Sequence, residues 1–423
     1  MLKMLKIIFF CLLFFALFIS CETQKNKTNS TLEDITFKDT TVAGGPDYFM
    51  EVHHVVLKGS NFEIGKQIAK IAQKNGVQIN PSGDRLRNRV QREYLKNNYS
   101  IFHDRMRGVA EGYGLHIEDD AYDFSTLFQY PRDQLGCSVA FYPGSFTENG
   151  HSILSRNYDF TTGTIQGKRP KENEVAVMSR PYIFEMYPDQ GYPSLSLCAF
   201  DMLGGVMDGI NSEGLTVAIL GDDETVMEYG VRPALGIGMH ELLSMRYLLD
   251  NCQDVREAKD AMLGLKHYYS FIPCHYIIAD KHGHSFVFEF SSLRNSTHII
   301  DGEGPQCVTN HLLSNYQSIE EFPGKTQLDS YDRYMKLYAS ISSKKNFNIE
   351  EIKSINSSVA NLNMDFDHPD YAPHRTLWHS LYDIEKRSVR VKFYLRDGMH
   401  PSENEVEVIE YSDYLTFHLK EKN

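Results

Sequence analysis

The sequence lacks the features on which several large classes of protein depend. It has no basic stripe: 56 Asp and Glu residues outnumber 43 Lys and Arg residues, and the formal net charge is -13. Counterion release from phosphates therefore supplies no binding energy, which argues against a nucleic-acid partner. Internal repeats and low-complexity segments are also missing. With 423 residues and 42% apolar content, the chain is expected to bury a sizeable core.

The seven cysteines lack the close spacing of a zinc site or a disulfide framework. Two of them, Cys11 and Cys21, lie in the first 21 residues. An odd number remains, so at least one thiol is expected to be free; the five are Cys137, Cys198, Cys252, Cys274 and Cys307. His53-His54, and His374 with His379, have no third ligand at a suitable local spacing, so we expect no metal and no cofactor.

No transmembrane anchor is expected at the N-terminus. The apolar run from Ile7 to Ile19 is too short to span a bilayer comfortably, and it follows two lysines, as in an export signal. The run ends in Leu17-Phe18-Ile19-Ser20-Cys21, which resembles the bacterial lipobox, in which the cysteine is acylated. A conventional signal peptide cut nearby is the alternative.

These features predict a lipoprotein signal peptide over residues 1–20, lipidation of Cys21 and a polar tether over residues 21–50. The expected location is the bacterial cell envelope, where the exported chain is anchored by lipid to the outer membrane with a periplasmic or surface face. The expected partners are therefore a membrane, reached through the lipid anchor, and a small molecule; a homo-oligomer is left open.

Residues 51–136 are predicted as a mainly helical N-terminal segment. Val52 to Leu57 is a β-branched run that predicts a strand. Ser60-Asn61-Phe62-Glu63 then has the spacing of a capping box ahead of a helical pattern. From Arg85 to Tyr130 the apolar residues keep helical spacing without strand alternation.

Residues 137–423 are rich in short apolar runs separated by turn residues, which predicts a layered α+β domain. Strands are predicted over 138–142, 152–158, 174–178, 194–200, 215–220, 276–279 and 285–290. Helices are predicted over 236–249, 255–263 and 349–356. Two further strands, over 376–382 and 388–395, flank a turn and predict a hairpin near the C-terminus.

A second hairpin is predicted around Cys137, which stands where the helical part gives way to the β-rich part. Asn149-Gly150 is a strong turn signal, so the strand after it should fold back and bring Arg156 and Asp159 toward Cys137. These two residues are three apart and would face opposite sides of a regular strand. One of them is therefore expected at a bend or a strand end.

Five segments in order resemble one family, that of the choloylglycine hydrolases and the acyl-coenzyme A:6-aminopenicillanic acid acyltransferases, within the N-terminal-nucleophile hydrolases. The segments are Gly136-Cys137-Ser138, Arg156 to Phe160, Gly209 to Leu215, Thr309-Asn310-His311 and Ser330 to Arg333. The resemblance covers most of Val52 to Leu395. It is closer to the acyltransferase branch, which also keeps a long helical segment ahead of its cysteine.

This resemblance implies a four-layer αββα fold and a precursor that cuts its own bond between Gly136 and Cys137. Residues 51–136 would become a separate chain that stays associated with the catalytic domain, residues 137–423. The new α-amino group, with a pKa of about 7.7–8.0, would activate the Cys137 thiol, so that no catalytic histidine is needed. His311 is interpreted as a packing or hydrogen-bonding residue.

The remaining roles are carried over from the family one residue at a time. Asp159 matches the carboxylate that holds the α-amino group, and Asn310 matches the oxyanion-hole asparagine. Arg333 matches the arginine that orders the site, and Arg156 matches an arginine of the bile-salt and penicillin V hydrolase branches. Asn211 matches a turn residue, with Gly214 supplying a positive φ.

The expected activity is hydrolysis of a linear amide, a non-peptide C–N bond of a small N-acyl compound, or transfer of its acyl group, through an acyl-Cys137 intermediate. Two alternatives stay open. One is a dipeptidase of the related N-terminal-cysteine group, although in that group the cysteine usually lies close behind the signal. The other is a non-catalytic lipoprotein that binds an amphipathic ligand with the same fold.

Overall fold

The computed structural model describes residues 37–129, 136–164, 166–171, 174–230, 236–270, 272–291, 296–324, 328–362, 368–399 and 407–420. The predicted signal peptide, Cys21 and the first part of the predicted tether lie outside these residues. Within them, no helix is both long and apolar enough to cross a membrane.

The strands of the described residues form two large sheets and one short ribbon. Sheet I has nine strands in the order β1-β2-β5-β6-β7-β8-β11-β12-β13, and sheet II has seven, β14-β3-β4-β15-β16-β17 with β18 beside β16. The strands of sheet I are β1 (Phe37–Gly44), β2 (Glu51–Gly59), β5 (Tyr182–Pro188), β6 (Ser194–Cys198), β7 (Val206–Asn211), β8 (Thr216–Gly221), β11 (Cys274–Ala279), β12 (Ser285–Ser291) and β13 (Ser296–Asp301).

Sheet II is antiparallel throughout its described pairs, and it holds the hairpins predicted around Cys137 and near the C-terminus. Its strands are β14 (Gln306–Val308), β3 (Gly136–Tyr142), β4 (Ile153–Thr161), β15 (His374–Asp383), β16 (Ser388–Met399), β17 (Glu407–Tyr411) and β18 (Leu415–His418). The ribbon pairs β9 (Met239–His240) with β10 (His267–Tyr268).

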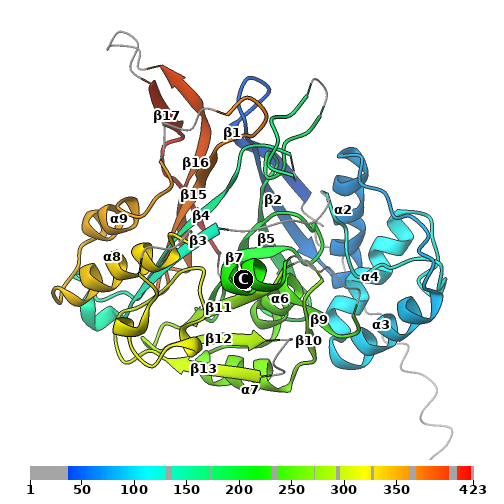
Figure 1. The fold of residues 1–423 in the computed structure, drawn as a ribbon. Coiled ribbons are helices and arrows are strands. Elements are labelled where there is room, and N and C mark those ends of the chain that lie inside the picture. The colour runs from blue at the N-terminus through cyan, green and yellow to red at the C-terminus, as the bar shows by residue number, and fades with distance from the viewer. Residues whose placement is uncertain are drawn as a thin grey trace, which may run out of the picture. The chain divides into compact units, whose positions relative to one another are not determined.

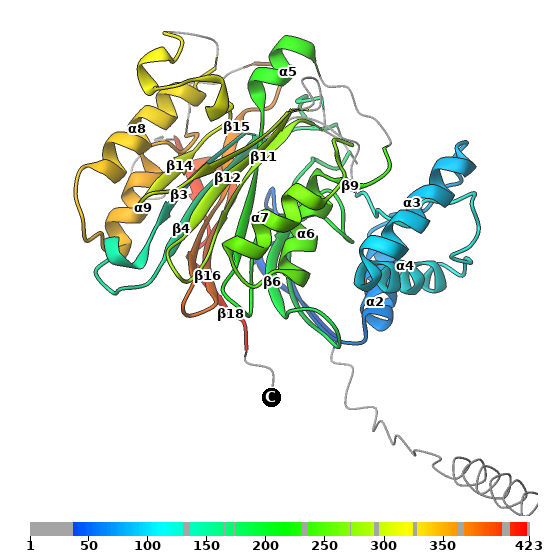
Figure 2. The same ribbon diagram turned by 90° about the horizontal axis from the view of Figure 1, so that it is seen from below.

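The helices cover the outer faces of the two sheets, as Figure 2 shows. On one side, α8 (Ser330–Ser342) packs on β14 and β3, and α9 (Ile349–Ser357) packs on β4 and β3. On the other side lie α6 (Glu241–Asn251) and α7 (Val255–Gly264), with α6 against β7 and β8. This order of helix, sheet, sheet and helix layers confirms the predicted α+β αββα class. A short helix, α5 (Asp223–Tyr229), follows β8.

The N-terminal segment adds α2 (Asn61–Lys74), α3 (Arg85–Asn98) and α4 (Ser100–Gly112), which lie together at one side of the fold (Figure 1). The Ser60 hydroxyl accepts a hydrogen bond from the Glu63 amide at 3.2 Å, which caps α2 as the sequence predicts. Ile64, Ile68 and Ile71 are buried on one face of that helix. The region from Arg85 to Tyr130, which the sequence predicts to be helical, thus contains two helices, α3 and α4. Residues 113–129 form turns and irregular structure.

Two expectations about the chain are corrected. The tether was predicted to extend to residue 50, but Phe37–Gly44 forms β1 and pairs antiparallel with β2. Its polar, largely exposed pattern is that of an edge strand, which the sequence does not distinguish from a tether. The predicted strand at residues 174–178 is also wrong, because that segment is irregular and ends at Met178 with a φ of 64°.

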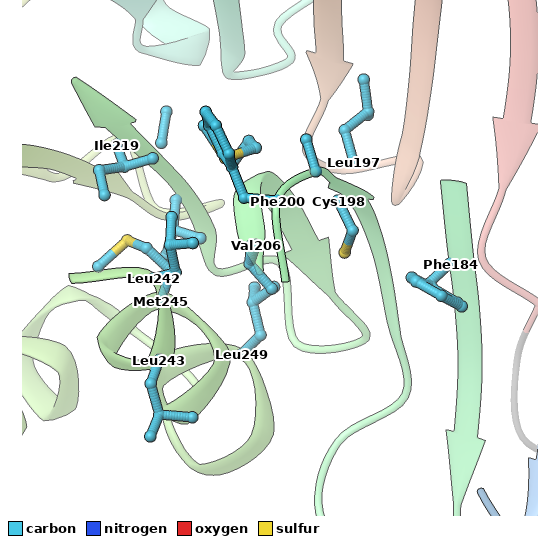
Figure 3. Packing of buried hydrophobic residues seen from close by; sticks show 14 of the residues in the cluster. Phe184, Leu197, Cys198, Phe200, Val206, Ile219, Leu242, Leu243, Met245 and Leu249 are labelled. Carbon is cyan, nitrogen blue, oxygen red and sulfur yellow. The ribbon is translucent and has the colours of Figure 1, made fainter. Parts of the chain in front are cut away.

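The core lies between the sheets and beneath α6. Figure 3 shows Leu242 and Leu249 of α6 beside Val206 of β7, with Leu197 and Phe200 nearby. A second cluster fills the space between sheet II and the helices α8 and α9. Sheet II is thus covered on both faces at β3 and β4, and every side chain of β4 is buried. The polar residues of β4 must therefore find partners inside the protein.

Candidate active site

The β3–β4 hairpin brings the predicted site residues together. The strands pair antiparallel, with Gly136 opposite Asp159 and Cys137 opposite Tyr158. Gly150 closes the connection with a φ of 71°. The prediction that the second strand folds back toward Cys137 is confirmed.

Cys137 is fully buried, and a side chain contacts each of its three polar atoms. Its amide N–H donates to Asn310 Oδ1 at 2.8 Å, and its carbonyl oxygen accepts from Arg333 Nη1 at 2.6 Å. Arg156 Nη2 donates to Sγ at 3.1 Å. Burial raises the pKa of the thiol to about 11, although the Arg156 charge opposes this shift. The thiol is therefore protonated at neutral pH unless a base removes its proton.

Arg156 reaches the thiol from a buried ion pair. Its Nη1 pairs with Asp208 of β7, and its Nη2 also donates to the Ile219 carbonyl at 2.8 Å. Asp208 accepts further hydrogen bonds from Tyr382 at 2.5 Å and from Trp378 at 3.3 Å. Both charged side chains are fully buried. The sequence gives no sign of the role of Asp208, because its partner is revealed only where the two sheets pack against each other.

Asp159 lies on the opposite face of β4 from Arg156, near the end of that strand. Thr376 donates to its Oδ1 at 2.5 Å, and β15 carries a register shift between Thr376 and Trp378, opposite this point. The expectation of a bend or strand end at one of the two residues is confirmed. Burial raises the pKa of Asp159 to about 6, and the Arg333 charge and the Thr376 hydrogen bond oppose this shift.

Asn310 and Arg333 approach Cys137 from the chain after β14 and from the first turn of α8. Arg333 Nη2 donates to Asn310 Oδ1 at 3.0 Å and to Asp329 Oδ1 at 2.9 Å. Asn310 Nδ2 donates to the Gly221 carbonyl at 2.9 Å. The side-chain oxygen of Asn310 thus faces the Cys137 nitrogen, and the side-chain NH₂ of Asn310 donates one hydrogen bond to the Gly221 carbonyl. The structure brings all five predicted residues to one place: Cys137, Arg156, Asp159, Asn310 and Arg333.

His311 lies next to the site but has a packing role, as predicted. Its Nδ1 faces Ser330 Oγ at 2.9 Å, and burial lowers its pKa to about 4. Asn211 forms the predicted turn: its Oδ1 accepts from the Leu215 amide at 3.0 Å, and Gly214 has a φ of 86°. The other four cysteines are free and buried, in agreement with their interpretation as core residues: Cys198, Cys252, Cys274 and Cys307.

The histidine pairs have partners that the sequence did not reveal. His53 Nδ1 lies 2.7 Å from Asp39, and His54 Nε2 lies 2.9 Å from Glu185. His379 contacts Ser155 Oγ at 2.9 Å. In the described part of the chain, three further possible metal ligands lie close together where the β3–β4 and β15–β16 turns meet. The ligand atoms of His151, Asp383 and Glu385 are within 4.8 Å of one another. There Lys386 Nζ is 3.2 Å from Asp383 and would compete with a cation.

The chain matches a family of amide hydrolases and acyltransferases of the N-terminal-nucleophile class, and it has the layered fold expected of that class. The model of the acyl-coenzyme A:6-aminopenicillanic acid acyl-transferase family matches residues 145–396. The chain belongs to this family, and it is an enzyme of the kind that acts on linear amides. None of the curated proteins matches it.

Several solved structures are similar to this chain at low identity, among them the two that follow. A mutant of the conjugated bile acid hydrolase from Clostridium perfringens is 16% identical, with a TM-score of 0.41 over 66% of this chain and 97% of that one. The penicillin V acylase from Agrobacterium tumefaciens is 17% identical, with a TM-score of 0.37 over 61% of this chain and 83% of that one.

Proposed function

We propose that this protein is a self-cleaving cysteine amidohydrolase or acyltransferase in which Cys137 is both the nucleophile and the N-terminus of the mature catalytic chain. The observation that carries the proposal is the set of contacts at Cys137. Asn310 holds its nitrogen, Arg333 its carbonyl oxygen and Arg156 its sulfur. Any buried backbone N–H and C=O group needs a partner, so the contact that distinguishes Cys137 is the buried guanidinium on its sulfur, which a structural cysteine does not need.

Self-cleavage would start from the Gly136–Cys137 peptide within β3. The Cys137 sulfur attacks the Gly136 carbonyl carbon, the C–N bond breaks, and the thiol proton passes to the departing nitrogen. Water then hydrolyses the thioester, which leaves a carboxylate on Gly136 and a free amine and thiol on Cys137. Asn310 Oδ1, which accepts from this nitrogen at 2.8 Å, can hold the new amine in the same place.

Turnover would use that amine as the base. With a pKa of about 7.7–8.0, an α-amino group can take the thiol proton near neutral pH. The thiolate attacks the carbonyl of the N-acyl substrate and expels the amine, which takes its proton from the α-ammonium group. The acyl-Cys137 intermediate then passes its acyl group to water or to a second amine. Asp159 favours the ammonium form through its negative charge.

Arg156 would stabilise the thiolate that burial disfavours. It donates to the sulfur, and its ion pair with Asp208 fixes the guanidinium inside the protein. A charge-assisted hydrogen bond of this kind is about twice as strong as a neutral one. We also propose that the protein is anchored through Cys21 in the cell envelope, on the strength of the lipobox pattern.

The proposal is tested by turnover of a panel of chromogenic N-acyl amides. Cys137→Ala is expected to abolish turnover while the protein stays folded. Cys252→Ala is the matched control, because it removes another buried free thiol outside the site, and it should keep turnover within about threefold. Full turnover by Cys137→Ala would exclude Cys137 as the nucleophile.

A further inference from the structure

A cavity lies on the outer face of sheet II, between the end of α9 and strands β15 to β17. It has a volume of about 440 Å³, within the range of small-molecule sites. Its polar lining includes Asn157, Thr376, His379 and Lys392, and Tyr411 forms part of the wall. The mechanism proposed above does not use this cavity.

The strand register separates the cavity from the Cys137 thiol. Asn157 is opposite His379, and His379 is opposite Lys392, so these three side chains lie on one face of three neighbouring strands. Cys137 is opposite Tyr158, the next residue along β4, and therefore faces the other side of the sheet. A ligand in the cavity would not contact the sulfur.

The cavity holds a lysine whose charge is not neutralised by an ion pair. Lys392 Nζ lies 4.6 Å from the centre of the Tyr411 ring and 5.6 Å from that of Tyr414. Within the described ranges no carboxylate lies at ion-pair distance from it. Burial lowers the pKa of Lys392, and the nearby charge of Lys353 lowers it further. An anion bound beside Lys392 would stabilise its charged form and so oppose both of these decreases in its pKa.

His379 and Asn157, two other polar side chains of the cavity, are already engaged in hydrogen bonds. His379 uses both ring nitrogens, with Nδ1 2.6 Å from Tyr414 Oη and Nε2 2.9 Å from Ser155 Oγ. Asn157 Nδ2 donates to the Asn356 carbonyl at 2.7 Å. Lys392 is thus the group in the cavity that is suited to a charged ligand.

Apolar side chains complete the cavity. Ala360, Leu362, Val408 and Ile409 line it together with the ring of Tyr411. One charged group among apolar walls is typical of a site that orients a ligand by its polar end and buries its hydrocarbon part. The cavity is therefore suited to an amphipathic anion.

We propose that this cavity binds a small carboxylate with an apolar tail, with the carboxylate paired to Lys392 and the tail among the apolar side chains. This inference does not depend on Cys137 being the nucleophile. It places the ligand one side chain away from Asp159, because Thr376 lines the cavity and donates to that carboxylate. The site is thus distinct from, but adjacent to, the residues around Cys137.

Octanoate binding to the full chain, measured by calorimetry in a Cys137→Ala background, tests the proposal. The background keeps the thiol chemistry out of the measurement. We expect saturable binding to one site, weakened about tenfold or more by Lys392→Met. Lys344→Met is the matched control: Lys344 also lies over a ring, that of Phe347 at 5.4 Å, but it pairs with Glu351 outside the cavity. It should leave the affinity unchanged.

Two further measurements keep the test independent of the folding of one variant. Lys392→Arg should retain binding, because it keeps the positive charge, and 1-octanol should bind about tenfold more weakly than octanoate, because it has the tail without the charge. Equal affinity of octanoate for the Lys392→Met variant, equal binding of 1-octanol, or no saturable binding would each overturn the proposal.

Discussion

At the scale of single residues, a buried ion pair between β4 and β7 positions the Arg156 guanidinium at the site. Arg156 and Asp208 are both fully buried, and removing one partner of such a pair typically costs about 3–5 kcal/mol. Within this pair, Arg156 places its positive charge at the sulfur of Cys137, and this charge opposes the rise in the pKa of the thiol that burial causes. Asp208 therefore matters to the site because it neutralises the buried charge of Arg156 and holds the guanidinium in place.

Asp159 gives a prediction about pH. Its pKa is near 6 in the folded protein and would be near 3.8 without burial, so the native state holds the proton more tightly than the unfolded state. Its contribution to stability is therefore present below about pH 4 and is lost as the pH rises through 6. The difference between these two pKa values corresponds to about 3 kcal/mol.

The measurement is the free energy of unfolding in urea of Asp159→Asn and its parent, both in a Cys137→Ala background. Asparagine can still accept from Thr376, so the main change is the loss of the titrating group. Relative to the parent, the variant should gain up to about 3 kcal/mol between about pH 4 and about pH 7.5. A difference that is independent of pH would show that Asp159 does not titrate in this range.

The sequence predicted the local part of the site and missed the long-range part. The Asn149-Gly150 turn was enough to bring Arg156 and Asp159 to Cys137, because the hairpin is a short-range structure. Asn310 and Arg333 were placed only by resemblance to the family. Asp208 and Thr376 were missed, because Asp208 meets Arg156 where one sheet packs on the other and Thr376 meets Asp159 where β15 pairs with β4, and periodicity encodes neither contact.

At the scale of elements, predictions succeeded where one strong local signal was present. The cap at Ser60 and the three isoleucines located α2, and the C-terminal hairpin formed with Asp383 opposite Ser388. The strand β7 was missed because Asp208 and Gly209 interrupt its apolar pattern. The helix α8 was missed although Tyr334, Leu337 and Ile341 pack in one cluster at spacings of three and four residues, a helical pattern that was available in the sequence.

The pairing of α2 with α4 depends on glycine. A Cβ atom at Gly108 would lie 1.9 Å from the Phe62 carbonyl oxygen, and one at Gly65 would lie 2.0 Å from the Arg105 carbonyl oxygen. Both contacts are with backbone, which cannot move away without separating the helices. The two helices therefore approach more closely than side chains would allow.

Gly108→Ala is expected to lower the free energy of unfolding by about 1–3 kcal/mol or more, since it forces the helices apart. Gly83→Ala is the matched control, because a Cβ atom there meets no atom within 4 Å. It should change stability by less than about 0.5 kcal/mol. Urea unfolding of both variants checks this, and equal stabilities would contradict the close packing of α2 and α4.

At the scale of the whole described unit, the N-terminal segment is part of the catalytic fold. It supplies β2 to sheet I, where β2 pairs with β5 in parallel and with β1, which precedes the segment, in antiparallel. The fully buried Arg105 of α4 also donates to Asp250 of α6 at 2.6 Å. If the bond before Cys137 is cut, these contacts predict that the two chains stay together under native conditions.

The lipid anchor is a prediction about the whole protein in its cell. Acylation at Cys21 should carry the protein into the detergent phase in a Triton X-114 partition, because buried acyl chains add about 0.8 kcal/mol per methylene group. Cys21→Ser should move it to the aqueous phase. Aqueous partitioning of the unchanged protein would rule out the anchor.

The central claim is that Cys137 becomes an N-terminal nucleophile, and the intact mass of the purified protein under denaturing conditions tests it most directly. The account predicts two fragments that meet between Gly136 and Cys137 and that elute together on a native column. Cys137→Ala should give one uncut chain. A single uncut chain from the folded, unchanged protein would leave Cys137 without a free amine and would contradict the account.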